Sequence, residues 1–337
     1  MLARTFDAAL DASVVLSFDR TGFRRHARRF RASDLDADLS GRGCLVTGAN
    51  AGLGRAVAAG LARRGARVGL LCRSEARGRE AERSLRAQTG SREIFYEPLD
   101  VSDLRSVRRC GARLAGERVD VLVHNAGVLP AAREETPQGL ELTFATHVVG
   151  PWLLTHLLES GLRRAGAARV VFVSSGGMYA ARLSCDDVAW RERAYDGVAA
   201  YAQTKRMQVV LGELLAKRLA PSGAVVHAMH PGWAETPGVE RSLPHFFRVM
   251  RRRLRTPDEG ADTALWLAVA ERPGRVTGRF WFDRREVATH LLPWTRDPSG
   301  ARERLIALVE RSAALGARRA GAPARRSAAP RAAGAAR

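Results

Sequence analysis

From Gly43 onward, short apolar runs alternate with longer stretches in which apolar residues return every three or four positions. A short apolar run is typical of a buried strand, and the longer period is typical of an amphipathic helix. The predicted strands are Cys44 to Thr47, Arg67 to Cys72, Ile94 to Leu99, Val119 to His124, Val170 to Ser174, Ala224 to Met229 and a weaker one at Arg279 to Phe282. The predicted helices are Leu53 to Arg64, Glu75 to Ala87, Asp103 to Ala115, Gly139 to Leu158, Val198 to Arg218 and Glu259 to Ala270.

The regular alternation of strand and helix predicts an α/β fold. In such a fold a doubly wound parallel sheet, here of about seven strands, is covered by helices on both faces. A chain of 337 residues can hold one such domain with an extension at each end. We divide it into an N-terminal extension over residues 1–40, a main domain over 41–295, a C-terminal helix over 296–316 and a tail over 317–337.

Both ends of the chain differ in composition from the main domain. Residues 23–30, FRRHARRF, could touch an anionic membrane or a partner, or they could form a solvated helix packed across the main domain, which we favour. Residues 317–337 hold six arginines among Ala, Gly and Pro, with no acidic residue and no apolar period. This composition predicts a disordered tail.

The formal net charge of +20 first suggests a nucleic-acid partner. Only two of the 55 basic residues are lysines, however, and the arginines are dispersed along the chain without a recognised binding module. We therefore expect no specific nucleic-acid partner. The four cysteines show neither metal spacing nor a disulfide framework, and no apolar run approaches the ~20 residues that cross a bilayer. We expect a cytoplasmic protein without a metal site or a transmembrane segment.

One of the two lysines, Lys205, follows Tyr201 by four positions in the sequence YAQTK. On a helix these two side chains share one face, and an ammonium beside a phenol favours the phenolate. We therefore predict that Lys205 lowers the pKa of Tyr201 from its usual value near ~10, so that Tyr201 can exchange a proton near neutrality. Arginine has replaced lysine almost everywhere else, which suggests that this position needs a compact, tunable charge.

A glycine-rich turn lies between the first predicted strand and the first predicted helix. Its spacing is GxxxGxG, in a strand, turn and helix context. Glycines there allow a pyrophosphate to approach the backbone, and the helix start supplies free N–H groups. The predicted dinucleotide contacts are Thr47, Gly48, Asn50, Gly52, Leu53 and Gly54.

The residues after the second and third strands bear on which dinucleotide binds. An acidic residue after the second strand selects NAD, but this chain has Arg73 there, which can hold a 2′-phosphate, with Arg55 as a possible helper. We therefore prefer NADP(H), with NAD(H) possible. Asp100 and Val101 follow the third strand, where the carboxylate could approach the adenine amino group or instead cap the next helix.

Further motifs complete a recognisable set. Asn125, Ala126 and Gly127 follow the fourth strand, Ser174 and Ser175 the fifth, and Pro231, Gly232 and Thr236 the sixth. Together with the glycine turn and Tyr201/Lys205, from about Gly43 to Pro293, they resemble the short-chain dehydrogenase/reductase superfamily. The runs VSSGGM, YAQTKR and HPGWAETPG, with the N-terminal extension, resemble its subgroup of dehydrogenase/reductase member 12 and bacterial relatives.

The resemblance implies an extended Rossmann fold and a role for each of these residues. Tyr201 is the expected general acid/base, Lys205 tunes it and holds the nicotinamide ribose, and Ser175 hydrogen-bonds the substrate oxygen. The expected lining of the cofactor cleft is Asn125, Ala126, Gly127, Pro231, Gly232 and Thr236.

The resemblance also implies that the helix signature Asn-x-x-Gly supports a water relay to the lysine. This chain has His147 in the asparagine position, and we expect the histidine to take that catalytic part with a different reach and its own titration. His124 stands where an asparagine often precedes Asn125, and we expect it to be a packed core histidine.

The segments from Ser175 to Tyr201 and from Leu243 to Met250 leave the carboxyl ends of strands, where ligands bind in such sheets. Their aromatic and aliphatic residues suit an apolar carbonyl or alcohol, although the second segment could simply pack as an amphipathic helix.

We expect an NADP(H)-dependent oxidoreductase that interconverts a carbonyl and an alcohol. The alternative is a nucleotide-binding regulatory or scaffold protein with weak catalysis. The resemblance also implies a homodimer or homotetramer.

Overall fold

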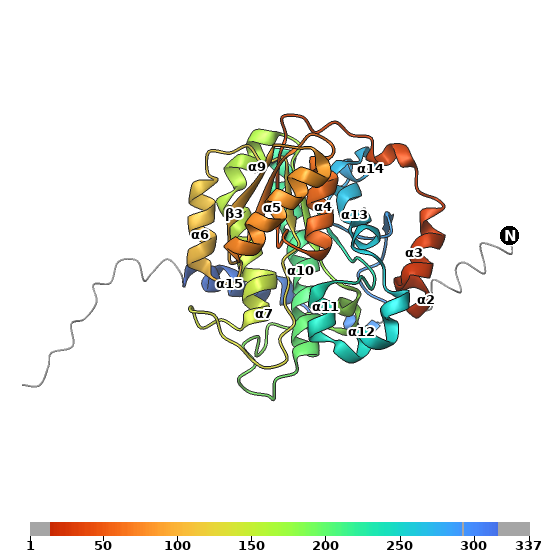
Figure 1. Cartoon of the computed structure of the whole chain (residues 1–337). Helices are drawn as coiled ribbons and strands as arrows, with labels where there is room; N and C mark the ends of the chain where they lie inside the picture. Colours follow the sequence, from red (N-terminus) through yellow and green to blue (C-terminus); the bar gives the residue numbers. More distant parts are fainter. Residues whose placement is uncertain (1–13, 292, 316–337) are drawn as a thin grey trace, which may run out of the picture.

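The computed structural model describes residues 14–291 and 293–315, and it has the predicted α/β architecture (Figure 1). Within these residues one eight-stranded sheet has the order β3-β2-β1-β4-β5-β6-β7-β8, with β1 to β7 parallel and β8 antiparallel. The strands are β1 Gly43–Thr47, β2 Arg67–Cys72, β3 Ile94–Pro98, β4 Val121–His124, β5 Arg169–Val173, β6 Val225–Met229, β7 Arg279–Phe282 and β8 Arg285–Glu286. The strand order reverses between β1 and β4, so the carboxyl ends of these two strands mark the expected ligand crevice.

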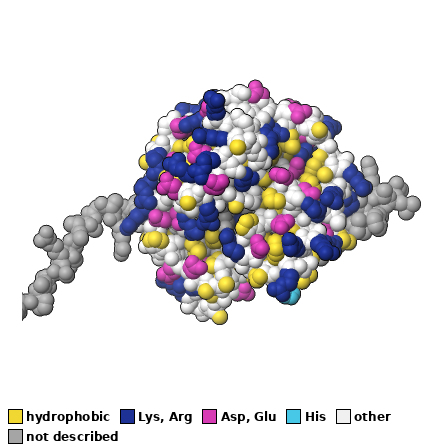
Figure 2. Space-filling model, viewed as in Figure 1, with side chains coloured by type: hydrophobic (Ala, Val, Ile, Leu, Met, Phe, Trp, Pro, Cys, Tyr) yellow, Lys and Arg dark blue, Asp and Glu magenta, His cyan; other side chains and the backbone are white. Residues whose placement is uncertain are grey.

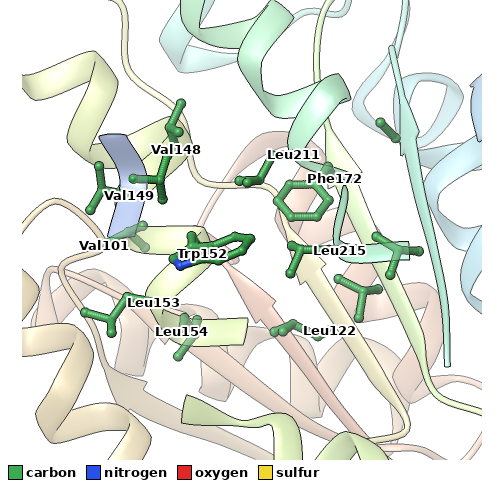
Figure 3. Packing of buried hydrophobic residues seen from close by; sticks show 14 of the residues in the cluster. Val101, Leu122, Val148, Val149, Trp152, Leu153, Leu154, Phe172, Leu211 and Leu215 are labelled. Atoms are coloured by element: carbon green, nitrogen blue, oxygen red, sulfur yellow. The ribbon is translucent and has the colours of Figure 1, made fainter. Parts of the chain in front are cut away.

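Helices cover both faces of the sheet, because strands buried on two sides need an apolar cover on each. On one face α4 (Gly52–Ala62) lies between α5 (Glu75–Thr89) and α13 (Pro257–Val269). The other face is covered by α6 (Leu104–Arg113), α8 (Gly150–Leu157), α10 (Gly197–Leu219) and α15 (Ala301–Ala314). Figure 3 shows the core beneath this second layer, where Trp152 of α8 lies among aliphatic side chains and the ring of Phe172 from β5.

The stretch predicted as one helix from Gly139 to Leu158 is instead interrupted. It consists of α7 (Leu142–Phe144), a π-helical turn over Ala145–Val149 and α8. Pro151 has no N–H, and its ring would collide with the carbonyl of His147 in a regular α-helix. The wider π turn just before Pro151 relieves that collision and places His147 at the bend.

The N-terminal extension packs across the main domain, as the favoured interpretation of the basic run predicts. It contains α2 (Val14–Phe18), α3 (Arg20–Ala27) and a 3₁₀ turn over Ala32–Leu35. Asp19 caps α3 by accepting from the N–H groups of Thr21 and Gly22. In α3, Arg20 pairs with Glu259 of α13 at 2.9 Å.

The remaining helices are short: α9 (Glu159–Ala165), α11 (Pro237–Ser242), α12 (Pro244–Met250) and α14 (Glu271–Gly274). The predicted disordered tail lies outside the described residues. Among the helices that the structure does describe, none is both long and apolar enough to span a membrane. Figure 2 shows basic side chains over much of the visible face, with acidic ones between them.

Candidate active site

The glycine turn joins β1 to α4 at the crevice. Helix α4 begins at Gly52, and the side chain of the preceding Ala51 provides no cap, so the N–H groups of its first turn can receive an anion. At Gly54 a β-carbon would lie 2.4 Å from Nδ2 of Asn125 and 2.7 Å from the carbonyl oxygen of Gly48. Only glycine therefore allows this close approach of helix and loop, which is the geometry that a dinucleotide pyrophosphate needs.

Thr47 and Asn125 tie this turn to the end of β4. The buried Thr47 hydroxyl accepts from the N–H groups of Asn125 and Ala126, both at 3.0 Å. In return, Nδ2 of Asn125 donates to the Thr47 carbonyl oxygen at 2.9 Å. These bonds hold the carboxyl ends of β1 and β4 in a fixed arrangement, so the predicted cofactor residues from the two strands do meet in space.

Beyond β2, Arg73 is 64% exposed and lies 3.9 Å from the carboxylate of Asp100. Its exposure and position leave the guanidinium able to meet a phosphate. The predicted helper, Arg55, instead donates to the hydroxyl of Ser84 at 2.8 Å.

The side chain of Asp100 accepts from the N–H and the hydroxyl of Ser102, at 3.0 and 2.7 Å. The cap of α6 is Asp103, which accepts from the N–H of Arg105. Asp100 is thus not that cap, and it stabilises the turn before the helix. Val101, its neighbour, is buried in the core.

The two serines after β5 have different environments. Ser174 is buried, and its hydroxyl donates to the backbone carbonyl of Lys205 at 2.9 Å, so it serves the packing of α10. Ser175 is partly exposed, accepts from the Gly177 N–H at 3.1 Å, and hydrogen-bonds the side chain of Tyr201. Of the pair, only Ser175 therefore faces the predicted acid/base.

Tyr201 and Lys205 lie on the same face of α10, but the prediction that Lys205 lowers the pKa of Tyr201 is wrong. Burial raises the pKa of Tyr201, and the hydrogen bond from Ser175 offsets only part of the rise. The Lys205 amine lies 5.5 Å from the ring centre and donates to the Val173 carbonyl and to Oε1 of Gln208, at 2.9 and 3.0 Å. Burial also lowers the pKa of Lys205 to about 7, so its charge at neutral pH is only partial.

His147 is fully buried beside this pair, with its ring edge-on to the ring of Tyr201 at 5.4 Å between centres. Its Nε2 accepts from the Val128 N–H at 3.0 Å, which leaves the proton on Nδ1 to donate to the Thr204 hydroxyl at 2.8 Å. Burial first, and then the charge of Lys205, hold the pKa of His147 well below its usual value. The ring is therefore neutral, and both of its nitrogens are engaged in the described structure.

His124, by contrast, is the expected packed residue. It is 1% exposed, stacks on Phe172 with 4.7 Å between ring centres, and bonds the hydroxyl of Thr155 at 2.8 Å. Burial lowers the pKa of His124 to about 3, so it stays neutral.

The loop after β6 passes over the glycine turn between β1 and α4. Gly232 has a φ of +70° just after Pro231, and Thr236 caps α11 by accepting from the Val239 N–H. A β-carbon at Gly52 would lie 3.2 Å from Cγ2 of Thr236, so Thr236 sits directly over the turn. The glycine turn, Asn125, Gly127 and Thr236 thus lie together where β1 and β4 end, whereas Val101 is buried in the core and cannot contact a cofactor.

The two predicted substrate segments differ in burial: the first contains buried residues, and the second lies at the surface. Met178, Leu183 and Trp190 are buried in the interior of the protein. The segment from Leu243 to Met250 forms α12, which has no fully buried residue and touches the crevice loop through the contact of Phe246 with Trp233, 5.3 Å between ring centres.

Sequence reasoning missed the buried Arg255, which links several loops at this end of the sheet. It lies in the run RRRLR, and nothing in a chain so rich in arginine distinguishes it from its neighbours. It also missed Phe18, because its contacts join segments that are more than 150 residues apart in the sequence.

Comparisons with known proteins bear on the same residues. The model of the short chain dehydrogenase family matches residues 42–245. Dehydrogenase/reductase SDR family member 12 from Bos taurus is 38% identical over 311 residues, which is 91% of this chain and 97% of the relative. Retinol dehydrogenase 13 from Homo sapiens is 34% identical over 259 residues, 73% of this chain and 77% of the relative.

Solved structures show the same fold. A candidate NAD(P)-dependent gluconate 5-dehydrogenase from Beutenbergia cavernae, solved with bound NADP, has a TM-score of 0.60 and 27% identity, covering 72% of this chain and 95% of that one. The family match and the relatives point to the same family. The chain belongs to the short-chain dehydrogenase/reductase family and is an NAD(P)-dependent oxidoreductase that acts on CH–OH groups.

Proposed function

We propose that this protein interconverts a carbonyl and an alcohol on an apolar small molecule, with NADP(H) as the preferred cofactor and Tyr201 as the general acid/base. The observation that carries the proposal is the hydrogen-bonded pair of Ser175 and Tyr201, with the amine of Lys205 behind the tyrosine ring. The similarity to retinol dehydrogenase 13, whose name indicates an apolar alcohol, supports the substrate class.

The cofactor would be held by the glycine turn and the first turn of α4 at its pyrophosphate, and by Arg73 at a 2′-phosphate. Thr236 and Gly127 would border the nicotinamide. A β-carbon at Gly127 would lie 3.3 Å from Nε2 of His147 and 3.7 Å from the amine of Lys205, so this part of the crevice adjoins the acid/base group. When bound, the nicotinamide supplies or accepts the hydride.

The protein's own part in reduction is to supply the proton. Because burial raises the pKa of Tyr201, its phenol stays protonated at neutral pH and can donate to the substrate oxygen. The hydroxyl of Ser175 would hold the same oxygen and stabilise the charge that develops on it. In oxidation the same tyrosine must first lose its proton, which its raised pKa makes harder.

Lys205 would act through its fixed amine. Two of the three donors of its ammonium form are used by Val173 and Gln208, which leaves one for a ribose hydroxyl. We assign His147 a positioning role, because its neutral ring joins the Val128 backbone to Thr204 and packs against Tyr201. A relay through His147 would require one of those two bonds to open.

A screen of aldehydes and ketones tests the proposal. Binding of NADPH, followed by its fluorescence, is expected of both an enzyme and a nucleotide-binding regulatory protein of this fold. Consumption of NADPH with an apolar carbonyl compound is expected only of the enzyme. If NADPH binds but no member of the panel is reduced, the regulatory alternative is supported and the proposed reaction is rejected.

A further inference from the structure

Within the described part of the N-terminal extension, Phe18 at the end of α2 contacts the loop that carries Ser175. A β-carbon at Gly176, the residue after Ser175, would lie 2.5 Å from Cε2 of Phe18. The ring edge of Phe18 therefore rests on the α-carbon of Gly176, a contact that any larger residue at 176 would prevent. Phe18 itself is only partly buried, and its contact with Gly176 places it one residue from Ser175 in the sequence.

Phe18 belongs to an aromatic cluster beside the loop that follows β6. Its ring centre lies 4.6 Å from that of His230, 5.2 Å from that of Phe282 and 6.0 Å from that of Trp233. Trp233 in turn contacts Phe246 of α12. Since His230 and Trp233 flank the Pro231-Gly232 turn, Phe18 lies between the loop that carries Ser175 and the loop that crosses the crevice.

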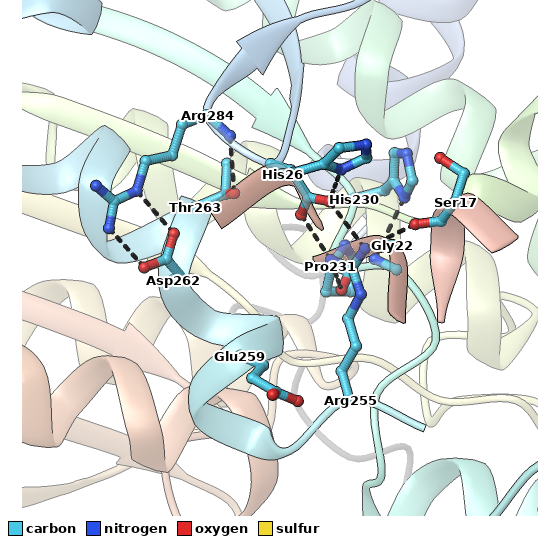
Figure 4. A network of polar contacts seen from close by, with 12 residues as sticks. Ser17, Gly22, His26, His230, Pro231, Arg255, Glu259, Asp262, Thr263 and Arg284 are labelled. Atoms are coloured by element: carbon cyan, nitrogen blue, oxygen red, sulfur yellow. Dashed lines mark hydrogen bonds and ion pairs between the residues drawn. The ribbon is translucent and has the colours of Figure 1, made fainter. Parts of the chain in front are cut away.

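Hydrogen bonds hold the backbone carbonyls of Phe18 and of both its neighbours. Its carbonyl accepts from the Trp233 N–H at 2.8 Å. The buried guanidinium of Arg255 donates to the carbonyls on either side, those of Ser17 and Asp19, at 3.0 and 3.2 Å. Figure 4 shows Arg255 at the centre of this network, with Ser17 and Pro231 among its neighbours.

Arg255 connects the same backbone to the end of the sheet. It donates to the Pro231 carbonyl at 3.2 Å and makes two bonds to the carboxylate of Asp283, at 2.6 and 2.9 Å. The side chain of Asp19 is also held, by Arg253 at 2.6 Å. The backbone on both sides of Phe18 is thus held in place by hydrogen bonds to the main domain.

We propose that Phe18 is a wall of the substrate pocket and sets the breadth of the apolar group that can lie next to the reacting carbonyl. The inference rests on the proposed function and adds a residue from outside the dehydrogenase domain to its specificity. A flat aromatic ring beside Ser175 admits a slender aliphatic chain and excludes a broad ring system. Broad substrates are rejected by steric conflict, which changes KM and kcat/KM more than cofactor binding.

The test compares hexanal with naphthaldehyde as substrates of the full-length enzyme. Phe18→Ala is expected to raise the ratio of kcat/KM for naphthaldehyde to that for hexanal by about 10-fold or more, and Phe18→Trp to lower it. Both variants should bind NADPH as the wild type does. Phe30→Ala is the matched control, because Phe30 lies in the same extension and packs on Arg284.

Thermal unfolding identifies variants that have lost their fold, and Phe18→Leu replaces Phe18→Ala if the latter does not fold. An unchanged ratio in folded Phe18 variants overturns the inference while leaving the proposed reaction intact. An equal change in Phe30→Ala also overturns it, because the effect would then be a general loosening. A wild-type chain that reduces no carbonyl compound contradicts the proposed function, and this inference with it.

Discussion

Replacing Arg255 with methionine tests whether the network around it holds the N-terminal extension on the domain. Arg255 is fully buried, and it makes two hydrogen bonds to the carboxylate of Asp283, which is 1% exposed. The substitution fills similar volume but removes the guanidinium from the buried Asp283 carboxylate, which then has His26 as its remaining partner among the described residues. Removing one partner of a buried ion pair costs about 3–5 kcal/mol.

That cost is large against the roughly 5–15 kcal/mol by which domains are stable. At roughly 2–4 °C per kcal/mol for large domains, the midpoint of thermal unfolding should fall by at least about 6 °C. Urea unfolding followed by tryptophan fluorescence measures the free energy directly. Arg275→Met is the matched control, because the side chains of Arg275 and Glu271 in its ion pair are 73% and 82% exposed, so solvent screens the pair and its loss should change stability little.

A second substitution separates the charge from the packing. Without Arg255, the buried Asp283 carboxylate keeps its 2.6 Å contact with Nδ1 of His26. Adding Asp283→Asn to Arg255→Met removes this poorly compensated charge, so the double variant should be more stable than Arg255→Met alone. The reasoning is refuted if Arg255→Met is within about 1 kcal/mol of Arg275→Met, or if the double variant is no more stable than the single one.

Three further results are expected. Gly54→Ala should weaken NADPH binding at least about 10-fold, because its β-carbon would collide with Asn125, whereas Gly116→Ala, with open space around it, should bind normally in the same fluorescence titration. Arg73→Ala should weaken NADPH about 10-fold or more and leave NADH unchanged, since it removes a charged hydrogen bond to the 2′-phosphate; equal loss for both cofactors would exclude that contact. Because burial raises the pKa of Tyr201, this tyrosine should stay protonated up to about pH 10 in the cofactor-free protein. Ultraviolet titrations of the wild type and of Tyr201→Phe should therefore coincide below that pH. A tyrosine that ionises near ~pH 8 in the wild type but not in Tyr201→Phe would contradict the direction of the shift.

Most of the fold could be predicted because the signals are local. The predicted strands Arg67–Cys72 and Arg279–Phe282 have the observed bounds, since each is an apolar run with a clear end. The interruption at Ala145–Val149 escaped prediction, although Pro151 was its visible cause. The short β8, of two residues, has no periodicity to detect.

The sequence could predict that Tyr201 and Lys205 lie close together, but it could not predict the electrostatics of the candidate site. Spacing places Tyr201 and Lys205 on one face of a helix, and both do lie there. It cannot show that Val173 and Gln208 engage the amine, or that burial outweighs the charge. The role of Arg255 depends on contacts with Ser17 and Asp283, which are 238 and 28 residues away from it in the sequence, and such contacts leave no local pattern.

The most direct test of the central claim is the turnover of Tyr201→Phe beside the wild type, with an aldehyde that the wild type reduces. Removing the proposed proton donor should lower kcat by about 10²- to 10⁴-fold while the affinity for NADPH stays unchanged. Tyr96→Phe, on the edge strand β3, should retain full activity. A Tyr201→Phe enzyme within about twofold of the wild-type kcat would contradict the assignment of the acid/base role to this residue.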